Sequence, residues 1–295
     1  MAHDTSQLAA LTRLFSSAVF RELAKNGRSA LFRRLIDHAD IASRFDSHAT
    51  VGDVFDSAFG ILKVAGKRDE YIYRAAIADK ILMGTHSLRT ASMLNEFRAG
   101  VCKADLVILN GTATVYEIKS ERDSLARLSN QVENYKRVFA TVNVIASEGH
   151  IDGVLATVPE DVGVMCLSQR YQISSVRDAI DCPERICPFT VFESLRLAEA
   201  AAILKSFDVA VPLVPNTQRH AVLRELFGTL EPSALHIQMV RTLKRTRNLA
   251  PLADLVDRLP GSLTAAALSI PVRRADHNRL VEAVGTPLEA TVAWN

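Results

Sequence analysis

Two short runs rich in β-forming residues, separated by an asparagine–glycine pair, place the strongest constraint on how this chain folds. Residues 104–109 (ADLVIL) form an apolar run typical of a buried strand, and residues 112–119 (TATVYEIK) are rich in β-branched and aromatic residues. Asn110-Gly111 between them is a strong signal for a two-residue hairpin turn. The sequence therefore predicts an antiparallel hairpin in which residue 105 lies roughly opposite residue 116.

Helical and strand patterns alternate around this hairpin. Residues 85–97 predict a helix with Thr85 as its N-cap, and residues 124–140 predict a second helix. Further strands are indicated at residues 142–147, 162–168 and 171–176. The pattern favours an α/β (α+β) fold with a small mixed sheet flanked by helices.

The chain divides into three regions by pattern. Residues 1–65 form an N-terminal helical region, residues 66–190 contain the sheet, and residues 191–295 form a C-terminal helical region interrupted by prolines. Apolar residues near the amino terminus fall at helical spacing, which favours an amphipathic helix over a signal peptide: Leu8, Leu11, Leu14, Phe15 and Val19. No run approaches the roughly 20 apolar residues that span a bilayer. We therefore expect a soluble, cytoplasmic protein with no membrane partner.

Glu117 and Lys119 are the residues of the hairpin that point to chemistry. Residues two apart in a strand face the same side at a separation of about 6.5–7 Å, and a buried strand gains nothing from charges on one face unless they are compensated. Asp105 on the preceding strand can reach the same end of the sheet if the hairpin is twisted or bulged. Glu96, at the end of the predicted preceding helix, could add a third carboxylate.

Carboxylates brought together repel one another unless a cation neutralises them. Mg²⁺ or Mn²⁺ suits such a site, because it binds carboxylate oxygens and keeps positions for water and a substrate phosphate. The metal would lower the pKa of a bound water, and Lys119 would either stabilise the charge that develops on the phosphate or orient the attacking water. This chemistry is phosphodiester hydrolysis.

The helix predicted after Lys119 adds a second clue. Its apolar stripe consists of Leu125, Leu128, Val132, Tyr135 and Phe139. Gln131 lies on the flank of this stripe and shares a side with Tyr135, four residues later. A glutamine in this position can direct its amide toward the edge of the site.

Asp105, then Glu117-Ile118-Lys119, then Gln131-Val132-Glu133-Asn134-Tyr135 together resemble the PD-(D/E)xK nuclease superfamily, and the Q-x-x-x-Y spacing is similar to its RecB-like branch. The stretch from Glu96 to Ser168 also resembles a family of bacterial proteins assigned to that superfamily. The resemblance implies a restriction-endonuclease-like core, with Asp105 and Glu117 as metal ligands and Lys119 as the catalytic lysine. It further implies that Glu96 is a helix-borne acidic ligand and that Gln131 and Tyr135 are the signature pair. The sequence departs from the pattern at Ala104, where the superfamily often has proline.

Structural interpretations compete with each of these roles. Glu117 and Lys119 could form an ordinary ion pair on an exposed edge strand, and Asp105 could be a simple strand-start residue. Gln131 and Tyr135 could be routine helix-flank and core residues, and Glu96 a solvated acid. Arg98 could contact phosphate, although a solvated arginine is the more common case. His86 and His150 lack partners at metal-ligand spacing and are interpreted as structural or surface residues.

Net charge, cysteine spacing and a basic cluster add few constraints on the function. The formal net charge of +2 neither requires nor excludes a nucleic-acid partner. The four cysteines match no zinc-ligand spacing, so we expect reduced thiols. A basic cluster lies on a predicted helix over residues 234–249 and includes Arg241, Lys244, Arg245 and Arg247. The first three share a helical face that could follow a phosphate backbone, although such runs are more often solvated.

The leading hypothesis is a Mg²⁺- or Mn²⁺-dependent nuclease that acts on nucleic acid, with DNA favoured over RNA. The alternative is a nuclease-like fold without catalytic activity that binds nucleic acid or another protein. The C-terminal helices could carry a protein partner or a homo-oligomer contact.

Overall fold

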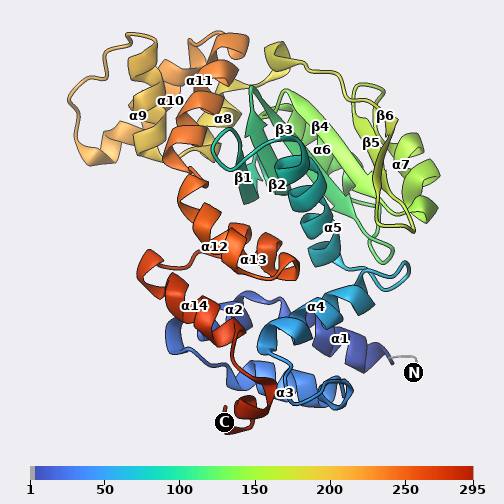
Figure 1. Cartoon of the computed structure of the whole chain (residues 1–295). Helices are drawn as coiled ribbons and strands as arrows, with labels where there is room; N and C mark the ends of the chain where they lie inside the picture. Colours follow the sequence, from blue (N-terminus) through green and yellow to red (C-terminus); the bar gives the residue numbers. More distant parts are fainter. Residues whose placement is uncertain (1–3, 295) are drawn as a thin grey trace. The chain divides into compact units, whose positions relative to one another are not determined.

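A six-stranded mixed sheet stands at the centre of the region that carries the candidate residues (Figure 1). The strands follow one another in the sheet in chain order: β1 Ser92–Ala99, β2 Cys102–Asn110, β3 Thr112–Lys119, β4 Thr141–Ala146, β5 Gly163–Leu167 and β6 Ile173–Arg177. Strands β3, β4 and β5 are parallel, whereas the β1–β2, β2–β3 and β5–β6 pairs are antiparallel. The expected mixed α/β fold is confirmed, as are the strands predicted at residues 104–109, 112–119, 142–147, 162–168 and 171–176.

This computed structural model describes residues 4–294 and separates into two units. One unit comprises His86–Ser168 and Gln172–Leu249, and it contains the whole sheet. The other comprises the described residues up to Thr85, the short segment Gln169–Tyr171, and the described residues from Ala250 onward.

The helix predicted over residues 85–97 is wrong, because Ser92–Ala99 form the edge strand β1. Phe97 and Ala99 are buried while Arg98 between them is exposed, which is the alternation of a strand. Gly100, with a φ of 60°, then turns the chain directly into β2. Glu96 therefore lies on a strand and is not the helix-borne residue that the resemblance implied.

The register of the central hairpin differs from the prediction by one residue. Gly111 has a φ of 75° and is the pivot of the turn, so that Asn110 pairs with Thr112 and Leu106 pairs with Tyr116. The prediction that residue 105 lies opposite residue 116 is therefore wrong. A shift of one residue exchanges the two faces of a strand, and here it brings Asp105 to the level of Glu117.

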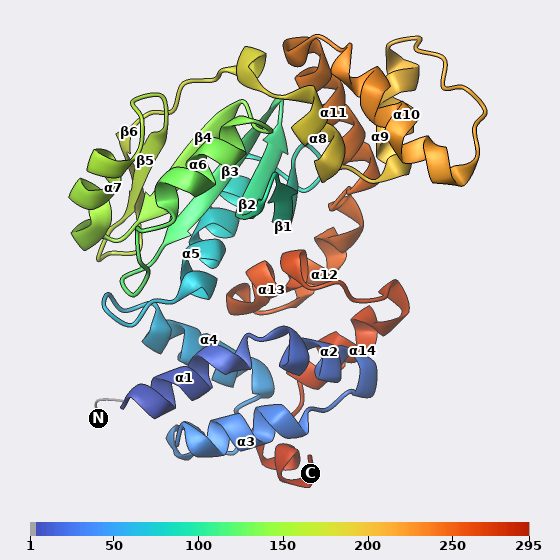
Figure 2. The same ribbon diagram turned by 180° about the vertical axis from the view of Figure 1, so that it is seen from behind.

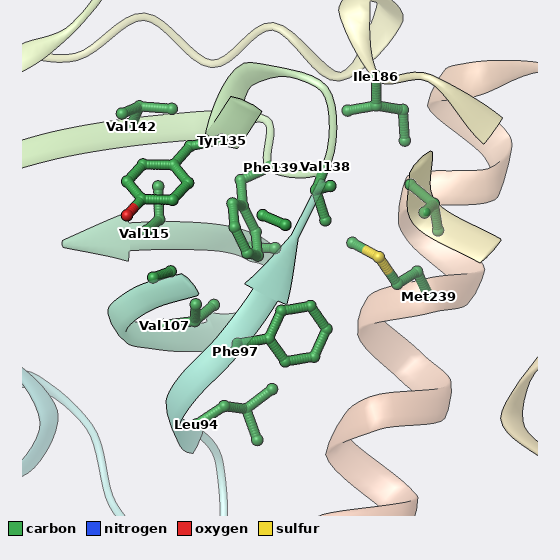
Figure 3. Packing of buried hydrophobic residues seen from close by; sticks show 14 of the residues in the cluster. Leu94, Phe97, Val107, Val115, Tyr135, Val138, Phe139, Val142, Ile186 and Met239 are labelled. Atoms are coloured by element: carbon green, nitrogen blue, oxygen red, sulfur yellow. The ribbon is translucent and has the colours of Figure 1, made fainter. Parts of the chain in front are cut away.

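Helices cover the sheet on the face that carries Val107, Val115 and Val144. Helix α6 (Leu128–Lys136) makes the crossover that the parallel pair β3–β4 requires. It occupies only part of the helix predicted over residues 124–140. Figure 3 shows Phe97 and Val107 of the sheet beside Phe139 and Met239, and the ring centroids of Phe97 and Phe139 are 5.7 Å apart.

The other helices of this unit follow the sheet strands along the chain. They are α7 Ile151–Thr157, α8 Pro188–Ser194, α9 Leu197–Ser206, α10 Asn216–Gly228 and α11 Pro232–Thr246. Side chains of α8 to α11 belong to the same apolar cluster as those of α6 and the sheet. Because Ala113 and Val115 on β3 face this cluster, strand alternation directs Glu117 toward α6.

The second unit is built from helices at both ends of the chain. They are α1 Thr5–Leu14, α2 Ser17–Asn26, α3 Ala30–His38, α4 Val51–Leu62, α5 Glu70–Ile77 with the π-helical extension Ala78–Met83, α12 Ala253–Arg258, α13 Thr264–Ser269 and α14 His277–Val284, with short 3-10 turns at Ala42–Arg44, Ala250–Leu252, Gly261–Leu263, Arg274–Asp276 and Leu288–Ala293. Helices α2 and α14 pack side by side, as both views show (Figures 1 and 2). Leu11, Leu14 and Val19 are buried, in agreement with the apolar spacing in the sequence.

None of the helices in residues 4–294 is both long enough and apolar enough to cross a membrane.

Candidate functional site

Glu117 is the centre of a buried hydrogen-bond network on β3. Its side chain is 2% exposed, although it carries a carboxylate. Oε1 accepts hydrogen bonds from Nζ of Lys119 at 2.8 Å and from Nε2 of Gln131 at 2.5 Å, while Oε2 accepts from the Tyr135 hydroxyl at 2.6 Å. A buried carboxylate is costly unless such donors compensate it. The network therefore explains how β3 tolerates this charge.

Lys119 and Gln131 are held by each other as well as by Glu117. Nζ of Lys119 donates to Oε1 of Gln131 at 3.0 Å, and the lysine side chain is only 7% exposed. Lys119 lies at the carboxyl end of β3, and Gln131 lies on the first turn of α6. Glu117, Lys119 and Gln131 thus meet in one hydrogen-bond network, and the interpretation of Glu117–Lys119 as an exposed edge pair is wrong, because β3 is an interior strand.

Tyr135 closes the network from α6. Its hydroxyl lies 2.6 Å from Oε2 of Glu117 and 2.8 Å from the carbonyl oxygen of Lys103. Burial raises the pKa of Tyr135 above its usual value, and the neighbouring negative charge of Glu117 raises it further. Tyr135 therefore remains a hydrogen-bond donor throughout the neutral pH range.

Asp105 and Glu96 form an acidic pair beside this network. The β1–β2 ladder pairs Asn95 with Leu106 and Phe97 with Ala104, and it omits the level at which Glu96 and Asp105 face each other. Glu96 has a φ of 52°, a left-handed conformation that is uncommon in a strand. The two residues offer carboxylate oxygens within 4.8 Å of each other.

The irregularity at this level changes the face of the sheet to which successive side chains of both strands point. Leu94 and Phe97 belong to the same core cluster, as do Ala104 and Val107, although residues three apart in a regular strand face opposite sides. Oδ2 of Asp105 accepts a hydrogen bond from the backbone N–H of Ile118 at 2.8 Å, where the β2–β3 ladder has already ended. This hydrogen bond connects the irregular part of the β1–β2 pair, where Glu96 lies, to the end of β3.

The three predicted carboxylates do not form one compact set. Among residues 4–294, Glu117 does not join Glu96 and Asp105 in a group whose ligand atoms all lie within 4.8 Å of one another. The pair that could share a cation is Glu96 with Asp105, and Glu117 is engaged by Lys119, Gln131 and Tyr135.

Arg98 lies on the rim of this region. It is exposed, and its Nε donates to the carbonyl oxygen of Gly100 at 3.3 Å. Its cross-strand partner on β2 is Lys103, which is also exposed and whose Nζ lies 4.0 Å from a carboxylate oxygen of Glu96. Two cations therefore stand directly opposite each other on the edge of the sheet.

Other sequence candidates make local contacts. A ring nitrogen of His86 lies 2.9 Å from Nδ2 of Asn110, and Nδ1 of His150 lies 2.9 Å from the Ser147 hydroxyl. Arg247 donates two hydrogen bonds to Glu199, at 2.9 and 2.8 Å. The four cysteines are free thiols.

The sequence analysis did not identify two residues that contribute to the site. Asn134 accepts a hydrogen bond from the N–H of Val101 and thereby holds the β1–β2 turn against α6, and Lys103 supplies the carbonyl acceptor for Tyr135. The alternation of Glu96, Phe97, Arg98 and Ala99 before Gly100 was the signal that could have revealed this hairpin.

Comparison with known proteins places the chain in a family. The family described as bacteriophage P4 protein cII matches residues 63–250. The chain belongs to this family. Protein cII of Enterobacteria phage P4 is 29% identical over 164 residues, which cover 54% of this chain and 60% of that relative. The chain therefore spans less than two thirds of the length of the curated relative that it matches.

Among solved structures, the SPO1766 protein of unknown function from Silicibacter pomeroyi aligns with 40% of this chain and 81% of its own length. The sequence identity is 18% and the TM-score is 0.28. All the candidate residues described above lie within the 63–250 segment that defines membership of the P4 protein cII family.

Proposed function

We propose that this member of the P4 protein cII family is a metal-dependent nuclease that hydrolyses phosphodiester bonds, with DNA as the favoured substrate. The observation that carries the proposal is the buried arrangement of Glu117, Lys119, Gln131 and Tyr135, next to the acidic pair of Glu96 and Asp105. A mixed sheet flanked by helices is compatible with the restriction-endonuclease-like core that the sequence resemblance implies.

Lys119 would contact the scissile phosphate. An ammonium group has three N–H donors, and two of those on Lys119 are used by Glu117 and Gln131. The third has no partner among residues 4–294 and is available to a phosphate oxygen. Because Lys119 is already fixed by two acceptors, it would stabilise the developing charge without first having to be ordered.

The residues present fit a hard divalent cation. Mg²⁺ and Mn²⁺ prefer oxygen ligands, and Glu96 and Asp105 offer carboxylate oxygens within 4.8 Å of each other. Oε1 of Glu117 already accepts two hydrogen bonds, so Oε2 is the oxygen of that residue with room for a further contact. A bound metal would lower the pKa of a water ligand and offset negative charge on the phosphate.

Residues of the chain would position Lys119 during the reaction. Water would attack phosphorus in line and release a proton to solvent, while the bond to the leaving oxygen breaks and that oxygen takes up a proton from solvent. Glu117, held by three donors, keeps Lys119 directed toward the phosphate. Gln131 and Tyr135 are positioning residues, because they act through Glu117 and Lys119.

The edge of the sheet supports a nucleic-acid substrate. Like charges directly opposite on neighbouring strands repel each other, yet Arg98 and Lys103 occupy such a pair and both are exposed. A phosphate backbone would neutralise both cations. We expect Arg98→Gln and Lys103→Gln each to weaken DNA binding by a similar factor whatever the DNA sequence. Each substitution should also reduce the dependence of the DNA-binding constant on salt concentration.

The test is cleavage of single-stranded DNA, duplex DNA and RNA by purified protein in Mg²⁺ or Mn²⁺. We expect Lys119→Met and Asp105→Asn to lower the cleavage rate by about 10²-fold or more while the proteins remain folded. Lys136→Met is the matched control, because Lys136 is another ion-paired lysine of this unit, with Nζ 2.7 Å from Oδ1 of Asp161. Equal residual cleavage by wild type and the Lys119 variant would assign the activity to a contaminant.

A second function is favoured by one specific observation. Glu117 and Lys119 are almost completely buried, and Asp105 is bound to the backbone of Ile118, as expected of a structural polar network. The alternative is therefore a nucleic-acid-binding or protein-interaction module without turnover. Calorimetric titration with Mn²⁺ distinguishes the two: binding that is lost in Asp105→Asn supports the nuclease, whereas no binding with or without DNA supports the module.

A further inference from the structure

A hollow between α2 and the segment that precedes α14 carries an excess of positive charge. Its volume is about 310 Å³, which is at the lower end of the range for small-ligand pockets. Arg21 and Lys25 line one side, and Arg273 and Asp276 line the other. All of these residues belong to the helical unit that contains both chain ends, far along the sequence from Glu117 and Lys119.

Arg21 and Lys25 form an unfavourable pair on their own. They are four residues apart on α2, so their side chains share one face of the helix and repel each other. Both are exposed, and neither has an ion-pair or hydrogen-bond partner for its side chain among residues 4–294. An anion between them would remove this repulsion.

Arg273 is a third cation, and it is already oriented. Its Nε donates to Oδ2 of Asp276 at 2.9 Å, and Arg279 donates to the other carboxylate oxygen at 3.1 Å. Asp276 is only 7% exposed, and the hydrogen bond from Arg273 holds the pKa of this carboxyl below its usual value. The single acid of the hollow is thus occupied by two arginines, while the terminal nitrogens of Arg273 have no partner among the described residues.

Apolar atoms complete the wall of the hollow. Pro271 and Val272 line it, as does Ala24, which is almost completely buried. Cations that can bind an anionic group, combined with an apolar surface, match an anion attached to a carbon skeleton better than a bare ion. Arginine is well suited to phosphate because its planar guanidinium donates two parallel hydrogen bonds.

We propose that this hollow binds a phosphate group carried on an organic moiety, through Arg21, Lys25 and Arg273, with the moiety resting on Pro271 and Val272. The phosphate belongs either to a free nucleotide or to a nucleic-acid chain. This site is independent of the proposed nuclease centre, and neither requires the other.

The test is isothermal titration calorimetry of the full chain at a fixed low ionic strength, because salt screens exposed charges. The probes are inorganic phosphate, adenosine 5′-monophosphate and a short oligonucleotide without a terminal phosphate. We expect wild type to bind the nucleotide more tightly than inorganic phosphate. Removing two charge-assisted contacts in the double variant Arg21→Gln/Lys25→Gln should weaken binding at least tenfold.

A matched control separates a site from general charge attraction. Arg13 and Arg34 line a different hollow of the same unit, so Arg13→Gln/Arg34→Gln removes the same charge elsewhere. Val272→Glu adds a repelling carboxylate to the proposed wall and should also abolish nucleotide binding. If wild type binds the nucleotide more tightly than the other probes, the hollow is a small-molecule site. If Arg21→Gln/Lys25→Gln weakens binding of the oligonucleotide alone, the hollow is a nucleic-acid contact. The proposal is overturned if no probe binds less tightly to Arg21→Gln/Lys25→Gln, or if both double variants lose binding equally.

Discussion

At the scale of single residues, the hydroxyl of Tyr135 carries one proton and faces two acceptors. Replacing it in Tyr135→Phe would leave Oε2 of Glu117 and the carbonyl oxygen of Lys103 without this donor in a buried place. We expect the free energy of unfolding to fall by about 1–3 kcal/mol, which is the usual cost of unsatisfied buried polar groups. Urea denaturation of the purified variant measures this loss.

Tyr116 provides the matched control for that substitution. It lies on the same strand as Glu117 and is also buried, with burial raising its pKa to about 12. Its hydroxyl has no hydrogen-bond partner among residues 4–294, so Tyr116→Phe should change stability by clearly less than Tyr135→Phe. Equal losses from the two substitutions would show that ring packing, and not the bond to Glu117, explains the effect.

His236 on α11 predicts a pH dependence. Its Nε2 accepts a hydrogen bond from the backbone N–H of Ala113 at 3.2 Å, which requires an unprotonated nitrogen. Burial lowers the pKa of His236 below 6.5, and the nearby charge of Asp181 opposes this only in part. The unfolded chain therefore binds a proton more readily than the folded one.

The resulting stability is fully present above pH 6.5 and decreases as the pH falls below 6.5 toward the lower pKa of the folded state. His236→Gln keeps an acceptor for the Ala113 N–H but cannot be protonated. We expect the loss of unfolding free energy between pH 7.5 and 5.5 to be smaller in the variant than in wild type. Identical pH profiles would contradict this role of His236.

The side chains of the candidate site were predictable where the contacts depend on local periodicity. The two-residue spacing of Glu117 and Lys119 places them on one face of β3, and the four-residue spacing of Gln131 and Tyr135 directs both toward it. The contacts of Asp105 with Ile118 and of Tyr135 with Lys103 involve backbone atoms of distant residues. No sequence pattern encodes those, because they depend on the exact register of β2.

At the scale of elements, two tight turns set that register, and they differ in what surrounds them. Gly100 and Gly111 both have positive φ, where an L-residue is strained. A Cβ on Gly111 would meet no atom within 4 Å, whereas a Cβ on Gly100 would overlap with Oδ1 of Asn134. The β1–β2 turn is thus packed against α6, and the β2–β3 turn is open.

We therefore expect Gly111→Ala to cost about 1 kcal/mol from backbone strain alone. Gly100→Ala should cost more, because Asn134 must also move and release the N–H of Val101. Thermal unfolding of both variants measures the difference. If Gly111→Ala proves the more damaging substitution, the close approach of Asn134 to the β1–β2 turn is not important for stability.

The elements themselves show where local patterns are sufficient. The interior strands β2, β3 and β4 consist mainly of apolar or β-branched residues, and the sequence predicts them within one or two residues. The edge strand β1 is harder to recognise in the sequence, because the adjacent apolar residues Met93 and Leu94 break the alternation that Glu96 to Ala99 follow. Its strand conformation is determined by pairing with β2, which is a tertiary effect.

At the scale of the whole molecule, described segments near the two ends of the sequence pack together within one unit. The N–H of Val51 donates to the carbonyl oxygen of Thr286 at 3.0 Å, and the N–H of Leu288 donates to the carbonyl oxygen of Ala49 at 2.8 Å. The rings of Phe32 and Trp294 have centroids 5.8 Å apart. Local periodicity predicts the individual helices of this unit, but it contains no information that segments more than 200 residues apart share one core.

This arrangement predicts which fragments fold. The fragment of residues 1–85 should lack a cooperative thermal transition on its own, because its core and several backbone groups require partners from residues 250–294. Co-expression with residues 250–295 should restore that transition.

By contrast, the fragment of residues 86–249 contains every strand of the sheet and the whole apolar cluster around α6, and it should unfold cooperatively without either end. Circular dichroism of the three preparations measures these outcomes. A cooperative transition in residues 1–85 alone would contradict this prediction, which rests on the apolar burial that the distant segment supplies.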